Sequence, residues 1–251
     1  MKKAISIIAA AILFSFAGYK TLAQYPGGIT SFRCQEEGRV SWGFHYKEET
    51  VIPCRYDAVD ASSEGLTAVN IGGKASYNGS GSITTVKGGK WGYVSNTTGK
   101  EVIPCKYDAV REFNGGLAVV NIGGEKIMGS ISRGKFGFVD KAGKEIIPLK
   151  YDFAYDFSEG LAVVGLIDKC GFIDKTGSVV IPLKYDAAAP FSEGLAAVML
   201  NDKWGFINKT GAVVISLKYD EIIEDFSDGV AMVALDGREI KINKKGKEVD
   251  N

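Results

Sequence analysis

The sequence predicts an all-β protein made of tandem repeats, and three observations support this prediction. The segments "KCGFIDKTGSVVIPLKYDAAAPFSEGLAAVMLND" (Lys169–Asp202) and "KWGFINKTGAVVISLKYDEIIEDFSDGVAMVALD" (Lys203–Asp236) align without a gap, which gives a period of 34 residues. Within each copy, short segments alternate apolar and polar residues, as β-strands do. Glycine, Asp and Asn recur between these segments, where tight turns require them. We expect short antiparallel three-stranded units stacked in an open array.

Each unit is expected to contain three strands in a fixed order. The first, "GFID", ends in a turn that closes with Gly177, a residue suited to positive φ. The second, "SVVIP", is β-branched and ends at Pro182, which cannot donate a hydrogen bond to a ladder. The third, "LAAV", follows the glycine of a Ser-Glu-Gly turn. A closed β-propeller is the alternative architecture, which we disfavour because propeller blades usually hold four strands and run about 40–45 residues.

The whole chain divides along this period. Residues 24–251 form one repeat domain, with units at about 41–89, 90–134, 135–168, 169–202 and 203–236 and a degenerate cap at 237–251. Residues 1–23 read as a signal peptide, because Lys2 and Lys3 precede an apolar run that is too short to span a membrane. An N-terminal membrane anchor is the alternative. We expect a periplasmic or extracellular protein with no membrane span in the mature chain.

Two sets of aromatic positions recur in register, and both are predicted to be structural. The first precedes a glycine in every unit: Trp42, Trp91, Phe136, Cys170 and Trp204. A position that accepts Phe or Cys in place of Trp is a packing position, so Cys170 is expected to be a buried free thiol. The second set lies between a cation and an aspartate: Tyr56, Tyr107, Tyr151, Tyr185 and Tyr219.

The Arg/Lys-Tyr-Asp motif has two interpretations. It can be a row of sugar-stacking or cation-binding positions along one face. Alternatively, each Tyr fills the gap between units and each Asp accepts hydrogen bonds from the backbone of a following turn. Every copy carries the set, whereas an active site is seldom repeated five times in one chain. The sequence therefore favours the structural interpretation.

These motifs resemble one known family. The segments "KWGYVSNTTGKEVIPCKYD" and "KWGFINKTGAVV" with its following "LKYDEI" and "FSDGVAMV" are similar to WG repeats, named for their Trp-Gly pair. The resemblance covers roughly Ser41 to Val249, with Cys170 in place of Trp and Ser216 in place of Pro as departures. It implies tandem β-structure and adds no particular chemistry, because repeat families carry many functions on one scaffold.

Composition and motifs exclude several classes of function. The formal net charge is zero for the whole chain and −3 without residues 1–23, so we expect no nucleic-acid partner. The only histidine is His45, and no glycine-rich loop opens a helix, so no metal or cofactor is expected. Glu64, Glu159, Glu193 and Asp228 recur in turns and are poor candidates for a unique glycosidase pair. We expect no catalytic residue.

The four cysteines leave the disulfide pairing open. Cys54 and Cys105 occupy equivalent places in successive units, so a bridge is possible if those strands are neighbours. Cys34–Cys54 is the rival pairing.

Two insertions break the repeat and are the predicted binding loops. They are Asn70–Lys90 and Asn121–Lys135, and both follow the third strand of a unit. Because they attach at the same point, they should project from the same edge of the array, where repeat scaffolds build binding surfaces. Extended, mobile hairpin tips without a ligand are the alternative. The candidate binding residues are Tyr77, Asn78, Lys87, Lys126, Met128 and Arg133.

The functional prediction is an exported, non-catalytic repeat scaffold that binds an unknown protein or glycan. A purely structural envelope spacer is the second hypothesis. A glycan-active hydrolase is the third.

Overall fold

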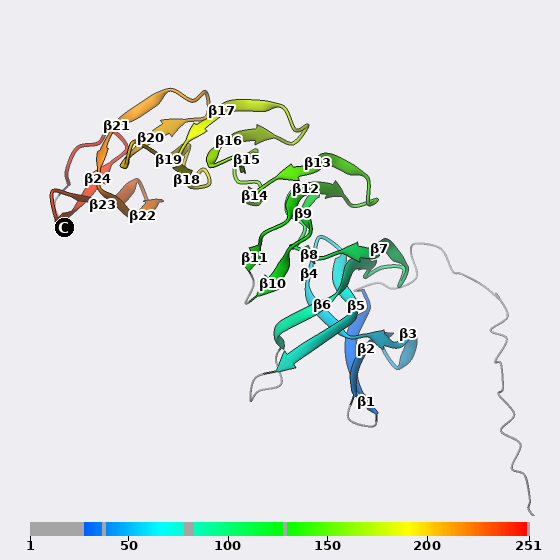
Figure 1. The fold of residues 1–251 in the computed structure, drawn as a ribbon. Coiled ribbons are helices and arrows are strands. Elements are labelled where there is room, and N and C mark those ends of the chain that lie inside the picture. The colour runs from blue at the N-terminus through cyan, green and yellow to red at the C-terminus, as the bar shows by residue number, and fades with distance from the viewer. Residues whose placement is uncertain (1–27, 37–38, 78–82, 128–129, 250–251) are drawn as a thin grey trace, which may run out of the picture.

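The computed structural model describes residues 28–36, 39–77, 83–127 and 130–249. Within these ranges the chain forms antiparallel β-sheets and no helix. The sheets, numbered here sheet 1 to sheet 6 along the chain, follow one another along an arc whose two ends stay apart (Figure 1). The predicted open, all-β repeat array is confirmed.

The strands are distributed as follows. Sheet 1 contains β1 (Thr30–Glu36), β2 (Arg39–Tyr46) and β3 (Glu49–Tyr56). Sheet 2 contains β4 (Ala58–Ser63), β5 (Leu66–Tyr77), β6 (Ile83–Ser95) and β7 (Glu101–Tyr107), and is extended by β10 (Glu125–Ile127) and β11 (Ser130–Ser132). Sheet 3 contains β8 (Ala109–Val110), β9 (Leu117–Ile122), β12 (Lys135–Asp140) and β13 (Glu145–Tyr151). Sheet 4 contains β14 (Phe153–Ala154), β15 (Leu161–Leu166), β16 (Lys169–Asp174) and β17 (Val179–Tyr185). Sheet 5 contains β18 (Ala187–Ala188), β19 (Leu195–Leu200), β20 (Lys203–Asn208) and β21 (Val213–Tyr219). Sheet 6 contains β22 (Glu221–Ser227), β23 (Val230–Leu235) and β24 (Arg238–Asn243).

The repeated sheets hold one strand more than the three expected in a unit. In sheet 4 the order is β14-β15-β16-β17, and the added strand β14 is only two residues long. It pairs with β15 through Phe153 and Ala154, a stretch too short to show a two-residue alternation in the sequence. Sheets 3, 4 and 5 therefore begin just after one Tyr-Asp motif and end at the tyrosine of the next. Four strands per sheet do not close the array, so strand number was a poor argument against a propeller.

The glycine that follows the recurring Trp, Phe or Cys of each unit (the ring position) allows two strands to approach closely. At Gly171, an added Cβ would lie 2.4 Å from the carbonyl oxygen of Ile181 on the neighbouring strand β17. The pairing of β16 with β17 is irregular at this point. The equivalent glycines, with the same kind of backbone obstruction, are Gly43, Gly92, Gly137 and Gly205. Any side chain here would push the last strand away from its sheet.

The hydrophobic core lies between consecutive sheets. Five clusters of buried side chains fill the spaces between the six sheets. At the junction of sheets 4 and 5, the rings of Phe172 and Phe191 lie 4.9 Å apart, centroid to centroid. Three further junctions have an equivalent pair: Tyr93–Phe113, Phe138–Phe157 and Phe206–Phe226. Each unit thus buries its faces only against its neighbours, as repeat proteins do.

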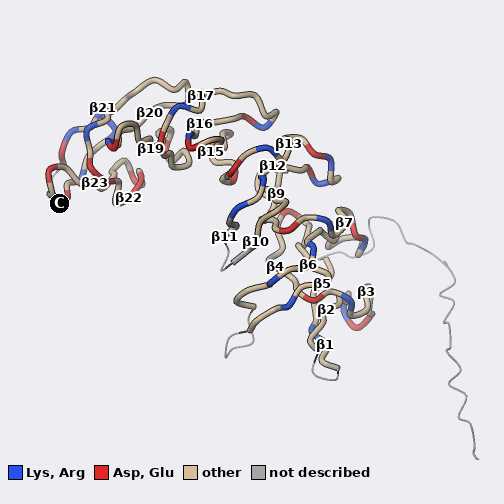
Figure 2. The backbone as a smooth tube through the Cα atoms, viewed as in Figure 1, with Lys and Arg blue, Asp and Glu red and all other residues tan. Residues whose placement is uncertain are grey.

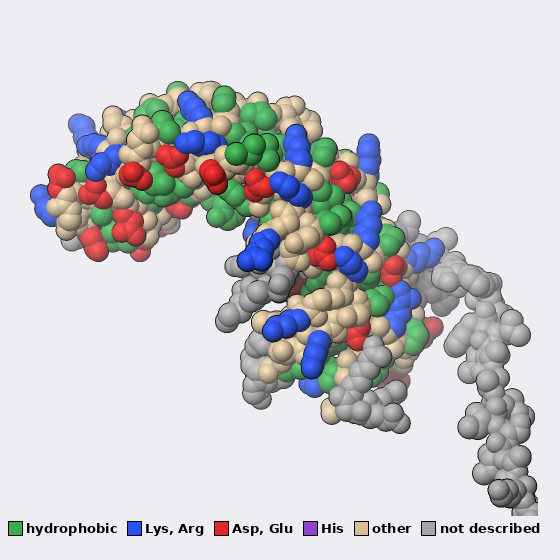
Figure 3. All heavy atoms as spheres, in the orientation of Figure 1, with side chains coloured by type: hydrophobic (Ala, Val, Ile, Leu, Met, Phe, Trp, Pro, Cys, Tyr) green, Lys and Arg blue, Asp and Glu red, His purple; other side chains and the backbone are tan. Residues whose placement is uncertain are grey.

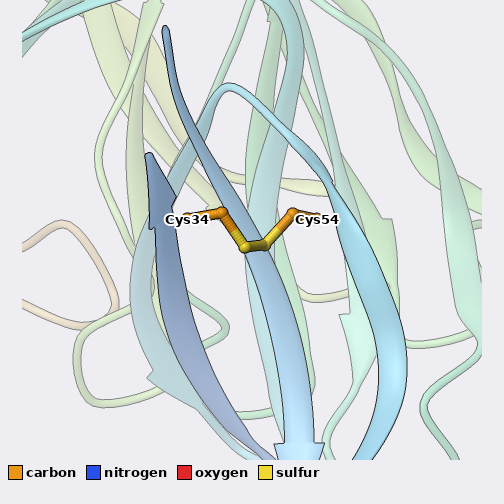
Figure 4. The surroundings of a disulfide bond; sticks show 2 residues. All are labelled: Cys34 and Cys54. Atoms are coloured by element: carbon orange, nitrogen blue, oxygen red, sulfur yellow. A yellow bond between two sulfur atoms is a disulfide. The ribbon is translucent and has the colours of Figure 1, made fainter. Parts of the chain in front are cut away.

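The cysteines pair within sheet 1. A disulfide joins Cys34 on β1 to Cys54 on β3, with the two Cα atoms 6.3 Å apart (Figure 4). It links the two strands that flank β2. Cys105 is a half-buried free thiol. Of the two pairings left open by the sequence, the structure contains Cys34–Cys54.

The ring positions differ in depth. Trp91, Phe136 and Cys170 are buried, whereas Trp42 and Trp204 are half-buried. Cys170 is a free thiol, and burial raises its pKa to about 11.

Candidate functional site

The Lys-Tyr-Asp motif is part of the architecture. In sheet 3, Tyr151 is buried between sheets and the ammonium of Lys150 lies 5.1 Å from the centre of its ring. Asp152 accepts a hydrogen bond from the backbone N–H of Ile167 at 2.9 Å and forms an ion pair with Lys135 at 2.5 Å. Lys135 and the Ile167 N–H hold the pKa of the Asp152 carboxyl below its usual value.

The same contacts recur along the array. The motif tyrosines Tyr56, Tyr107, Tyr185 and Tyr219 are buried as well. The motif aspartates accept backbone N–H groups in the pairs Asp57–Gly72, Asp108–Gly123, Asp186–Asn201 and Asp220–Asp236. Three of them also form ion pairs: Asp108 with Lys90, Asp186 with Lys169 and Asp220 with Lys203. In sheets 3 to 6 the bound N–H belongs to the connection that follows the second strand of the sheet, as between β15 and β16 for Asp152, and this supports the structural interpretation of the motif.

The recurring turn acids join one sheet to the next. Glu159 in sheet 4 accepts a hydrogen bond from the Gly194 N–H of sheet 5 at 3.1 Å and pairs with Lys209 at 3.0 Å. Glu193 makes the same contacts with Gly229 and Lys244 of sheet 6. Glu64 of sheet 2 contacts the Gly115 and Gly116 N–H groups and Lys141 of sheet 3. These acids lie at separate junctions along the arc.

The junction between sheets 3 and 4 lacks this carboxylate. Gly115 stands at the position that Glu159 and Glu193 occupy in later units. Its backbone φ of 60° is close to the 51° of Glu159. Lys175 of sheet 4 donates instead to the Gly115 carbonyl oxygen, at 2.7 Å. The Lys175 ammonium therefore binds a backbone carbonyl, whereas the equivalent Lys209 and Lys244 bind carboxylates.

The two insertions form adjoining hairpins. The first extends β5 and β6, which stay paired from Ile71–Lys90 outward to Tyr77–Ile83. The second is the hairpin of β10 and β11. The two are joined by pairing of Ile127 with Thr85, and both project from the same side of the arc (Figure 1). The expected common edge is therefore confirmed, and strand pairing unites the two insertions into one surface.

A buried asparagine anchors each hairpin at its base. Asn121 is fully buried and its Nδ2 donates to the Arg133 carbonyl oxygen at 2.9 Å. Asn70 is its counterpart, with Nδ2 3.4 Å from the Gly88 carbonyl oxygen. An added Cβ on Gly89 would lie 2.4 Å from Asn70 Oδ1. Sequence reasoning missed these residues, although the repeated "NIGG" at both insertions was a visible signal.

The structure describes three of the candidate binding residues fully. Tyr77 is half-buried, and the guanidinium carbon of Arg33 lies 4.8 Å from the centre of its ring. Lys87 and Arg133 are exposed. Lys126 lies in β10, but its side chain is outside the described part, as are Asn78 and Met128 altogether.

The first hairpin is basic. Lys74 on β5 faces Lys87 on β6 directly across the ladder. No acidic residue occurs between Asn70 and Lys90, and no described acidic residue forms an ion pair with either lysine. Figure 2 shows basic positions along β5 and β6, and Figure 3 shows Lys and Arg side chains over this region. Like charges that face each other across a ladder are destabilising, so Lys74 and Lys87 repel each other in the free protein.

No group of three or more His, Cys, Asp or Glu residues that could hold a metal is found among the described residues. His45 lies in β2, stacked on Phe32. In the part of the chain that the structure covers, no helix is long and apolar enough to cross a membrane.

The chain belongs to the WG-containing repeat family, whose model matches residues 44–74, 91–125, 136–169, 171–204 and 204–238. The comparison with curated proteins finds no match. Among solved structures, a eukaryotic initiation factor has a TM-score of 0.49 at 9% identity, over 88% of this chain and 61% of that chain. An extracellular domain of a one-component system from B. thetaiotaomicron has a TM-score of 0.36 at 13% identity, over 78% of this chain and 30% of that chain. The AfRom2 CNH domain has a TM-score of 0.29 at 11% identity, over 89% of this chain and 94% of that chain. All three are distant in sequence and in shape.

Proposed function

We propose that the protein is an exported, non-catalytic repeat scaffold that binds a protein or a glycan through its two insertion hairpins. The observation that carries the proposal is the pairing of Ile127 with Thr85. This contact joins hairpins from two different units into one surface. Later units make the same connection in two residues, as at Asn201-Asp202. Loops that served only as connections would therefore not need to be long or to pair with each other.

Two features support export. Residues 1–23 have the pattern of a signal peptide. The Cys34–Cys54 disulfide suits an oxidising compartment, because such bonds rarely persist where thiols are kept reduced.

A non-catalytic role is supported by the contacts of the repeated acids. The motif aspartates bind hairpin N–H groups, and Glu64, Glu159 and Glu193 link neighbouring sheets. Their hydrogen bonds and ion pairs hold the array together at separate places, whereas a glycosidase needs two carboxyl groups about 5–10 Å apart in one cleft.

The test removes the hairpins and keeps the array. Residues 72–89 and 123–134 are each replaced by the dipeptide Asn-Asp, which reproduces the connection between Leu200 and Lys203. Full chain and variant are then compared as baits in envelope extract, with cross-linking and with a glycan array in parallel. The proposal expects a protein or glycan captured by the full chain and lost by the variant, while the variant keeps its β-sheet circular dichroism. Equal capture by both, or no ligand for either, would contradict it.

A further inference from the structure

We propose that the ligand of the hairpin surface is an acidic polysaccharide, bound through its carboxylate or sulfate groups. This inference rests on the proposed function and specifies the class of partner. It starts from the facing pair Lys74 and Lys87, which weakens the free hairpin and gains an attractive role only beside an anion.

The chemistry of this face favours a sugar chain over a folded protein. Next to the lysine pair on the ladder, Ser76 faces Thr85, so the described cross-strand positions offer ammonium and hydroxyl groups. Protein interfaces usually depend on buried aromatic or aliphatic anchors at their centre, and the facing pairs Lys74–Lys87 and Ser76–Thr85 present none. Ammonium and hydroxyl groups at strand spacing can hydrogen-bond to anionic groups that recur along a hydrated polymer.

More cations lie nearby. Arg133 follows β11 and is exposed. Arg33 on β1 is also exposed and stacks on Tyr77, at the far end of the paired part of β5. No described acidic side chain forms an ion pair with either arginine. The basic groups therefore come from β1, from the first hairpin and from the end of the second.

The opposite end of the array contains an acidic segment. The segment Asp220–Asp228, which includes β22, contains five acidic residues and no basic one. Five basic residues between Arg238 and Lys247 follow in the same terminal unit, so this acidic segment repels a polyanion only locally. It also raises the competing possibility of a second copy, whose acidic segment would meet the hairpins.

The test uses two matched variants of the full chain. Lys74→Gln with Lys87→Gln removes the facing pair. Lys144→Gln with Lys247→Gln removes the same charge from exposed turn positions elsewhere in the array. Binding is measured by calorimetry to polygalacturonate, to heparin as the sulfated probe and to neutral dextran, at low and at physiological salt. Sedimentation velocity of each chain alone reports self-association.

The expected result is binding to one or both polyanions, none to dextran, and weakening by added salt. We expect affinity to fall at least about tenfold in the Lys74/Lys87 variant, since the cations it loses are those that meet the polymer. Binding by the Lys144/Lys247 variant should match that of the parent. The assignment would be overturned if the Lys74/Lys87 variant bound the polyanions as tightly as the parent, or if both variants lost the same affinity.

Two outcomes separate this inference from the proposed function. If envelope extract yields a protein whose capture requires the hairpins and neither polyanion binds, the scaffold function stands and the acidic glycan is wrong. If the parent chain self-associates at low salt and the Lys74/Lys87 variant does not, the partner of this surface is a second copy and the glycan is again wrong.

Discussion

The close approach of strands at the Trp-Gly position makes a quantitative prediction for Gly171→Ala. An added Cβ would lie 2.4 Å from the Ile181 carbonyl oxygen and 2.6 Å from that of Pro182, both backbone atoms that no rotamer change can move. A normal carbon–oxygen contact would require β17 to shift by nearly 1 Å away from β16. We expect the substitution to cost about 3 kcal/mol or more, at the upper limit of what overpacking usually costs.

Two other glycines serve as controls. Gly160 has a φ of 91° and open space around its Cβ position, so Gly160→Ala should cost only the backbone penalty, about 1–2 kcal/mol. Gly177 has a φ of 84° and an added Cβ would lie 3.2 Å from Cγ1 of Ile147, a side-chain atom that can adjust. Its substitution should rank between the other two.

Urea unfolding followed by circular dichroism gives the ranking, and hydrogen exchange shows where it acts. The loss in Gly171→Ala should be concentrated in sheet 4 and its neighbours, because a repeat array can open locally. A cost for Gly171→Ala no greater than that for Gly160→Ala would refute the close-approach explanation.

The remaining predictions concern the junctions and the disulfide. Lys209 and the Gly194 N–H lower the pKa of Glu159 below its usual value of about 4.5, so the carboxylate stabilises the fold above that pH and loses this effect as the pH falls through the lower, folded-state pKa. Glu159→Gln should therefore lower the melting temperature at pH 7 and make the melting temperature fall less between pH 5 and pH 3. An unchanged melting temperature at pH 7 would contradict the ion pair. Gly115→Glu should place a carboxylate beside Lys175, and a double-mutant cycle with Lys175→Met should give a favourable coupling of up to about 1 kcal/mol. The positive φ of Gly115 penalises any side chain, so the prediction concerns this coupling and not the net stability of the single variant. Additive effects would show that no new pair forms. Cys34→Ser removes a disulfide with a sequence separation of 20, and loop entropy predicts a loss of about 3 kcal/mol in the free energy of unfolding. Hydrogen exchange should become faster in sheet 1 and stay unchanged in sheets 4 to 6. A uniform increase along the array would contradict a local role for the disulfide.

Much of the array followed from the sequence because each unit repeats the same local rules. Turn glycines such as Gly177, with a φ of 84°, mark strand ends in the repeated units. The expectation that Pro182 ends the second strand was wrong, because β17 continues through it to Tyr185. This is possible because β17 is an edge strand, where a residue without an N–H is tolerated. The buried tyrosines and the hydrogen-bonded aspartates were predictable from repetition alone. The surrounding sheets could be placed in order because each repeat buries its faces against its neighbours.

Other features depended on contacts that periodicity does not encode. The strand β14 has two residues, too few to alternate, so the fourth strand of a sheet left no pattern. The choice of Cys34 as the partner of Cys54 depends on β1, which lies upstream of the first recognisable unit. The pairing of Ile127 with Thr85 joins segments 42 positions apart whose own sequences are Gly- and Ser-rich. The basic character of the hairpin was visible residue by residue, but the facing of Lys74 and Lys87 required the register.

The central claim is that the repeats form the scaffold and that the insertions bind the partner. Hydrogen exchange of the full chain, with and without the ligand that it captures, tests this claim directly. We predict that protection on binding is confined to residues 71–90 and 122–135 and to the adjoining β1. Protection that instead follows the Lys-Tyr-Asp motifs through sheets 3 to 5, with the hairpins unchanged, would contradict it.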